Sequence, residues 1–123
     1  MDYKEYIKIL IILLILDIPM ISYVNNKMYF SMFNKINNGQ VMTINNNKII
    51  SAIIAYLLLA FGLYYFIKNK NDAFILGIII YGVYNTTNYF TINNYSMEVA
   101  IKDTLWGGIL FYLIMWIYSK KIF

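Results

Sequence analysis

Two aspartates stand inside apolar stretches of this sequence, where a charged side chain needs a specific reason. Asp17 lies in "YIKILIILLILDIPMISYV", residues 6–24, and Asp103 lies in "VAIKDTLWGGILFYLIMWIY", residues 99–118. An isolated carboxylate at the centre of a bilayer costs about 2.5–3.5 kcal/mol even on lenient insertion scales. Carboxyl groups in such places serve as general acids or bases, as steps on a proton or cation route, as ligand contacts, or as hydrogen-bond partners between helices.

Helical periodicity brings further polar and aromatic side chains close to the two aspartates. Within residues 73–92, one helical face carries Tyr81, Tyr84, Asn85 and Asn88. Within residues 99–118, one face carries Asp103, Trp106, Gly107 and Leu110. At ~1.5 Å per helical residue, Asp17, Asn85 and Asp103 stand roughly 16–24 Å from one membrane surface, if both termini lie on that side. The sequence therefore predicts a polar layer inside the membrane, built from three helices. Its candidate binding residues are Asp17, Tyr81, Tyr84, Asn85, Thr87, Asn88, Asp103, Trp106 and Gly107.

The elements that must position these residues are membrane helices. The 123 residues are 61% hydrophobic and 13% charged, whereas a soluble domain usually has about 25% charged residues. The apolar segments of residues 6–24, 49–67, 73–92 and 99–118 have the roughly 20 residues needed to cross ~30 Å of hydrocarbon. We therefore predict an all-α integral membrane four-helix bundle, with residues 1–123 forming a single transmembrane domain.

The connection between the first two segments, residues 25–48, carries its own helical pattern. One face of it gathers Met28, Tyr29, Met32, Phe33 and Ile36. Apolar residues at this spacing, with polar residues opposite, are typical of a short amphipathic helix in the membrane interface. We predict such a helix over about residues 27–37, with an unstructured loop as the alternative, and the turn of this connection at Gly39.

The distribution of lysines indicates an orientation. With alternating spans, one side holds Lys4, Lys8, Lys68, Lys70, Lys120 and Lys121, and the other holds Lys27, Lys35, Lys48 and Lys102. This small excess favours both termini in the cytoplasm. The lysines are scattered and most flank apolar runs, so the net charge of +4 indicates anchoring at lipid headgroups and no nucleic-acid partner.

Missing residue types exclude several kinds of chemistry. The sequence has no Cys, His or Arg, so it lacks a thiol nucleophile, the commonest metal ligand and the bidentate phosphate-binding fork. We predict no metal and no cofactor. The abundance of Ile, Asn, Tyr and Lys is typical of an AT-rich coding genome, such as that of a low-GC bacterium or a large DNA virus.

One long run resembles a known family pattern. "YNTTNYFTINNYSMEVAIKDTLWGG" is similar to the pattern Tyr-Asp-x-Thr-Asn followed by Asp-x-x-Trp-Gly, found in small predicted membrane proteins named domain of unknown function 2177. That family also has an aspartate in its first span, matched here by Asp17. Asn85 stands where the family pattern has Asp, and the Trp usual after the first-span aspartate is missing. The resemblance implies a four-helix membrane bundle and implies no activity.

Four readings of the polar layer follow from these residues. The first is structural, with Asn, Thr and Asp side chains bonding helix to helix. The second is a pocket for a lipid or other small lipophile, lined by Tyr81, Tyr84 and Trp106. The third is conduction of protons or small cations along Asp17, Asn85, Asn88 and Asp103, which needs a homo-oligomer. The fourth is an enzyme with Asp103 as general acid or base, the least supported because no nucleophile with an adjacent base is present.

Overall fold

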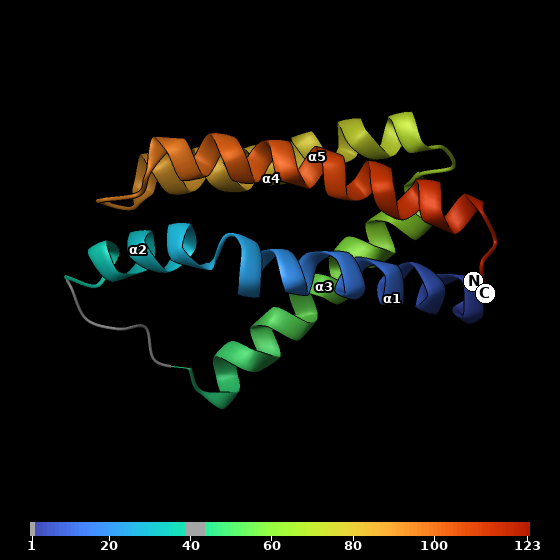
Figure 1. The fold of residues 1–123 in the computed structure, drawn as a ribbon, viewed down its shortest axis with the longest axis horizontal. Coiled ribbons are helices and arrows are strands. Elements are labelled where there is room, and N and C mark those ends of the chain that lie inside the picture. Colours follow the sequence, from blue (N-terminus) through green and yellow to red (C-terminus); the bar gives the residue numbers. More distant parts are fainter. Residues whose placement is uncertain (1, 39–43) are drawn as a thin grey trace.

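The computed structural model describes residues 2–38 and 44–123 of the chain, and these residues contain helices and short connections but no strands. The predicted all-α class is therefore confirmed. The elements, shown in Figure 1, are α1 (Tyr3–Pro19), the π-helix η1 (Met20–Val24), α2 (Asn26–Ile36), α3 (Asn46–Phe66), α4 (Lys70–Thr91) and α5 (Met97–Ser119). The turn predicted at Gly39 lies outside the described residues.

Polar side chains fix where the long helices begin. The residues that precede α1, α3, α4 and α5 each accept a hydrogen bond from a backbone N–H of the first helical turn; they are Asp2, Asn45, Asn69 and Ser96. Such N-caps satisfy a backbone donor that the helix itself leaves free. Between α4 and α5, Asn94 has a φ of 68°, a left-handed conformation that Asn adopts more readily than most residues. The resulting tight turn makes α4 and α5 an antiparallel hairpin.

A proline near the end of α1 accounts for the change of helix type that follows. Pro19 has no backbone N–H, so it cannot bond the carbonyl one turn earlier. Beyond it the helix widens, and the N–H of Asn25 donates to the carbonyl of Met20 at 2.9 Å, five residues back. α2 then continues roughly in the direction of α1 (Figure 1), so that α1, η1 and α2 run one after another beside α5.

The helices form a row in which each packs chiefly on its neighbour. α4 and α5 contact each other most extensively, α1 lies against both α5 and α3, and α2 reaches the beginning of α5. α3 crosses α1 obliquely, and its first half is exposed (Figure 1). α3 and α4 do not pack extensively on each other, so a closed four-helix bundle is not confirmed. Both termini lie at one end of the molecule, and the α4–α5 turn lies at the other (Figure 1).

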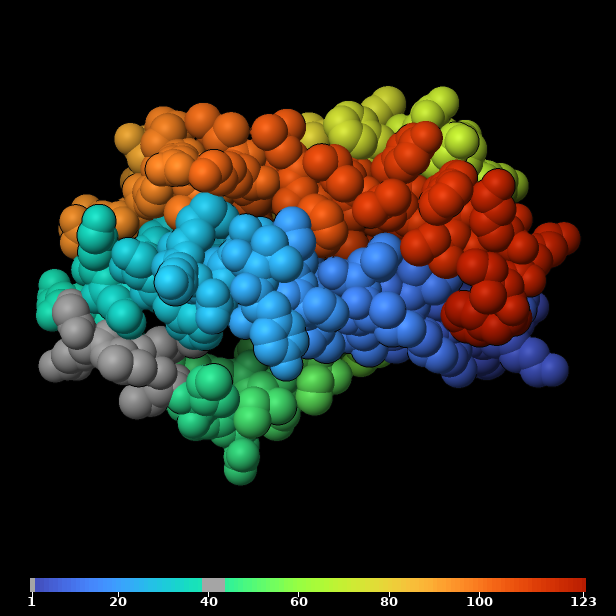
Figure 2. All heavy atoms as spheres, in the orientation of Figure 1, coloured from blue at the N-terminus to red at the C-terminus, as the bar shows by residue number. Residues whose placement is uncertain are grey.

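The apolar core occupies the end of the molecule that carries the termini. Its buried members are Ile9, Ile12, Leu13, Ala60, Leu63, Ala73, Leu110, Phe111, Ile114 and Met115. In each long helix these core residues lie closer to the end of the molecule that carries the two termini than the polar residues do. Those polar residues are Asp17, Tyr56, Asn85 and Asp103. A second, smaller cluster joins Met32 of α2 to Tyr95, Val99 and Ala100, and Figure 2 shows the atoms of α2 lying against the hairpin.

Length and composition single out three stretches that could cross a membrane: Tyr3–Val24, Asn46–Phe66 and Met97–Ser119. α4 has 22 residues and is long enough, but it is not among them. Its first turn carries Lys70 and Asp72, and its second half carries Asn85 and Asn88. Length and composition alone therefore do not identify residues 73–92 as a fourth span.

Candidate functional site

Polar side chains from several helices meet between the apolar core and the α4–α5 turn. Two of them are fully enclosed, since Asp17 is 3% exposed and Asn85 is 0% exposed. Asp103 is partly buried beside Asn85. The carboxyl groups of Asp17 and Asp103 have separate sets of hydrogen-bond partners, and we refer to the two sets together as the polar layer.

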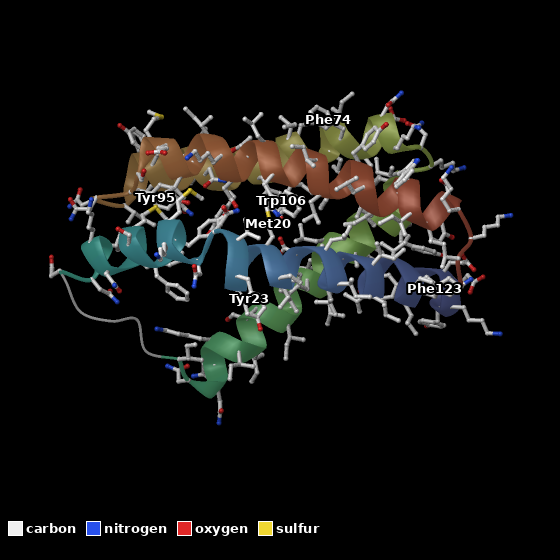
Figure 3. The ribbon with its side chains drawn as sticks, viewed as in Figure 1. Met20, Tyr23, Phe74, Tyr95, Trp106 and Phe123 are labelled. Atoms are coloured by element: carbon white, nitrogen blue, oxygen red, sulfur yellow. The ribbon has the colours of Figure 1, made fainter. Side chains whose placement is uncertain are left out.

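The first set joins three helices through Asp17 of α1. Its Oδ1 accepts a hydrogen bond from the indole Nε1 of Trp106 on α5 at 2.9 Å. Its Oδ2 accepts from the hydroxyl of Tyr56 on α3 at 2.7 Å. Figure 3 places Trp106 near the middle of the molecule, on the side of α5 that faces α1. Each carboxylate oxygen thus has a donor from a different helix.

The second set joins α2, α4 and α5 through Asp103 and Asn85. Asp103 Oδ2 accepts from Asn85 Nδ2 at 2.7 Å, and its Oδ1 accepts from the hydroxyl of Tyr29. Asn85 Nδ2 also donates to the carbonyl of Tyr81 at 2.8 Å. Asn85 Oδ1 accepts from the hydroxyl of Tyr95 at 2.8 Å. The amide of Asn85 therefore uses both its donor and its acceptor ends.

The buried polar atoms of the polar layer are paired, and the groups that donate to its two carboxylates are uncharged. The groups that donate to the two carboxylates are two phenols, one indole and one amide. In the part of the chain that the structure describes, no buried side-chain nitrogen or oxygen lacks a hydrogen-bond partner. Within the same residues no cluster of His, Cys, Asp or Glu could hold a metal ion. Each of the four carboxylate oxygens of the layer thus already has one donor from the protein.

The structure brings together six of the residues that the sequence singled out. Trp106 meets Asp17, and Asp103 meets Asn85 beside the carbonyl of Tyr81. Gly107 lies directly against Tyr81, because a Cβ added to Gly107 would stand 2.2 Å from the Tyr81 ring. Gly107 thus contributes a close approach between α4 and α5 and no polar contact.

Three other predicted residues lie at the edge of the layer or outside it. Tyr84 is 54% exposed, and Thr87 is exposed on the outer face of α4. Asn88 is partly buried, with its side chain beside the hydroxyls of Tyr84 and Tyr95. Neither of the two cavities described below is lined by Tyr81, Tyr84 or Trp106.

Three tyrosines that complete the polar layer were missed by sequence reasoning: Tyr29, Tyr56 and Tyr95. The chain has 13 tyrosines, and tyrosine is common at membrane interfaces, so residue type alone could not select these. Tyr29 had one usable signal, because it lies on the apolar face predicted for the helix over residues 27–37. Tyr56 and Tyr95 carried no signal that distinguished them from their neighbours.

Two surface cavities among the described residues are large enough to hold a small molecule, and neither is lined by Asp17 or Asp103. One, of about 440 Å³, lies between α4 and α5 and is lined by Asn71, Phe74, Ile75, Ile109 and Tyr112. The other, of about 520 Å³, lies between α2 and the beginning of α5. Tyr95 lines the second cavity and is also part of the polar layer, and Figure 3 places it at the end of the molecule near α2.

A substitution of Trp106 tests the first set of contacts. Trp106→Phe removes the N–H that bonds Asp17 Oδ1, and we expect the free energy of unfolding to fall by about 1.5 kcal/mol because a buried acceptor is left unpaired. Unfolding in mixed detergent micelles, followed by far-UV circular dichroism, measures this. Trp116→Phe on the same helix is the control, since Trp116 is 41% exposed and should change stability by less than ~0.5 kcal/mol. Equal effects of the two substitutions would contradict the assignment.

The fold and the polar layer define the class of this chain, an all-helical predicted membrane protein with three apolar helices able to span a bilayer. A sequence model of the family described as "Predicted membrane protein (DUF2177)" matches residues 3–118. The chain belongs to this family. No curated protein and no solved structure matches the chain.

Proposed function

We propose that this chain is a four-span membrane protein in which the polar layer has a structural role: its hydrogen bonds hold the helices together. We call this arrangement the clasp. The clasp holds α2 and the α4–α5 hairpin to α1 and α3. The observation that carries this proposal is that both oxygens of Asp17 and both oxygens of Asp103 already have protein donors. Hydrogen bonds between membrane helices contribute ~0.6 kcal/mol on average and up to roughly 2, so several together are a substantial contribution.

The pairing of α4 with α5 supports the fourth span. The two helices have 22 and 23 residues and pack side by side along their length (Figure 1). A helix that pairs in this way with an apolar spanning helix crosses the bilayer together with it. The buried amide of Asn85 is fully paired, which removes most of the cost of placing it there. The termini then share one side, and the lysine excess favours the cytoplasm.

The position of α2 completes the proposed topology. α2 lies at the end of the molecule opposite the termini and buries Met32, which is 3% exposed. Its remaining surface carries exposed Lys27 and Lys35. An apolar face with lysines on the other side is typical of a helix at the level of lipid headgroups. In this topology the hydrogen bond from Tyr29 to Asp103 fastens α2 to the spanning helices.

The same structure argues against conduction and catalysis. Within a single chain, a proton or cation that passed the polar layer would meet the apolar core, whose buried members carry no polar side chain. Catalysis by Asp103 would need a substrate to reach a carboxylate oxygen, yet both oxygens are engaged and neither described cavity contains Asp103. A structural role for the polar layer requires neither a path for ions nor access for a substrate.

Two substitutions at Asp103 test the proposal. In Asp103→Asn, the new amide oxygen can accept from Asn85 and the new amide nitrogen can donate to Tyr29, so we expect a stability change below about 0.5 kcal/mol. In Asp103→Leu both partners lose their bond, and we expect a loss of about 2 kcal/mol. Unfolding in mixed micelles measures both.

Two further measurements separate the clasp from the other readings. Proton flux into liposomes should be equally low for the wild type and for Asp103→Asn. Native mass spectrometry in gentle detergent should show no lipophile that Asp103→Asn specifically releases. A flux abolished by that substitution would establish conduction, and a bound lipophile lost with it would establish a ligand site at the layer.

A further inference from the structure

The cavity between α2 and the beginning of α5 has the dimensions and the lining of a ligand site. Its volume of about 520 Å³ falls within the roughly 300–1,000 Å³ range of small-molecule pockets. Residues of α2 form one wall and residues of the α4–α5 turn and of the first turn of α5 form the other; together they are Met28, Ser31, Met32, Lys35, Asn94, Tyr95, Ser96, Glu98 and Val99. None of the carboxylates of the polar layer belongs to it.

The lining divides into an apolar floor and a polar rim. The floor includes Met32 and Val99, both buried, together with Met28. The rim carries the ammonium of Lys35 and the hydroxyl of Ser31, both exposed. A site that joins a cation and hydroxyl donors to an apolar surface suits an amphiphile with an anionic polar group.

The charges around the rim favour an anion. The one acidic residue of the lining, Glu98, pairs with Lys102 at 2.6 Å, and this ion pair neutralises it. Among the described residues Lys35 has no carboxylate within ion-pair distance. The N-terminal end of α5 also faces this region, and its backbone N–H groups add positive potential. With Lys102 counted beside its partner Glu98, although Lys102 does not line the cavity, the two lysines outnumber the one carboxylate.

We propose that this cavity binds the headgroup of an anionic membrane phospholipid. The phosphate would lie at the ammonium of Lys35 and the hydroxyl of Ser31, and the start of the acyl chains would cover Met28 and Met32. A phospholipid is the occupant that the position of the cavity favours, because α2 lies at headgroup level in the proposed topology. The inference goes beyond the clasp but uses this placement of α2.

The experiment is a titration of purified protein in gentle detergent, followed by native mass spectrometry. The probe is phosphatidylglycerol, and diacylglycerol with the same acyl chains is the matched lipid without phosphate. We expect saturable binding of a single phosphatidylglycerol per chain and little binding of diacylglycerol. Lys35→Gln should weaken phosphatidylglycerol binding about tenfold, because a charged hydrogen bond is lost. Lys27→Gln, an exposed lysine of the same helix outside the cavity, should leave binding unchanged.

A second variant tests the cavity itself. Ser31→Phe places a ring over the rim and should abolish binding whatever the contribution of Lys35. Equal binding of diacylglycerol, or equal loss with Lys27→Gln, would overturn the proposal. Binding of inorganic phosphate that depends on Lys35, without binding of the lipid, would overturn it in favour of a soluble anion.

Stability measurements on the same variants separate this inference from the clasp. Lys35 and Ser31 make no contact with Asp17 or Asp103, so the unfolding midpoints of both variants should match the wild type. Absence of phosphatidylglycerol binding to the stable wild-type protein, or unchanged binding to stable Lys35→Gln and Ser31→Phe variants, would reject the lipid site alone. Failure of the clasp would appear instead in the Asp103 substitutions, which leave the cavity lining intact.

Discussion

Replacement of Gly77 by alanine is expected to push α4 away from α5 and to lower the free energy of unfolding by about 3 kcal/mol. A Cβ at Gly77 would stand 2.2 Å from the backbone oxygen of Gly107 and 2.7 Å from its carbonyl carbon. Backbone atoms in the middle of a helix cannot rotate aside, so the helices themselves must separate. Unfolding of the purified protein in mixed detergent micelles, followed by circular dichroism, measures the loss.

Two other glycines provide matched controls. In Gly82→Ala, on the same helix, the new methyl group would lie at 3.5 Å from the Thr104 side chain, which is an ordinary contact. In Gly62→Ala, on α3, nothing lies within 4 Å of the new atom. We expect Gly82→Ala to be nearly neutral and Gly62→Ala to gain up to ~1 kcal/mol from the higher helix propensity of alanine. Similar losses in all three variants would show that the α4–α5 contact is not specific to Gly77.

Asn85→Leu is the second substitution with a large expected effect, about 3 kcal/mol of destabilisation. Asn85 is 0% exposed and bonds Asp103, Tyr95 and the Tyr81 carbonyl. Leucine has a similar size but no polar atom, so Asp103 Oδ2 and the Tyr95 hydroxyl are left unpaired. Each buried unpaired group costs about 1–3 kcal/mol. The same unfolding titration measures the effect.

Thr87→Val and Tyr95→Phe are the comparison variants for Asn85→Leu, with a small and an intermediate expected loss of stability. Thr87 is exposed on the same helix, so its substitution should change stability by less than ~0.5 kcal/mol. Tyr95→Phe removes one of the bonds of Asn85, and we expect an intermediate loss of about 1 kcal/mol. If Asn85→Leu proved as mild as Thr87→Val, the polar layer would not act as a clasp.

The sequence by itself determined the helices and singled out the polar residues that lie within them. Hydropathy and periodicity are local properties, and they located α1, α2, α3, α4 and α5 to within a few residues of their observed bounds. The cost of a carboxylate in an apolar segment made Asp17 and Asp103 candidates before any fold was known. The same helical arithmetic placed Asn85 in one layer with these aspartates but assigned no partner to any of them.

Only the tertiary structure decided which partners these groups have. Periodicity predicts which residues share a helical face but not how much of that face a neighbouring helix covers. Tyr84 shares a face of α4 with Asn85, yet it is exposed. The hydroxyls of Tyr29 and Tyr56 reach Asp103 and Asp17 because α2 and α3 cross the other helices at particular angles. These angles depend on contacts between residues far apart in sequence, such as Tyr6 with Leu57 and Met32 with Ser96. Local sequence patterns carry no information about those distances, so the separation of the layer into two sets of contacts appeared only in the folded chain.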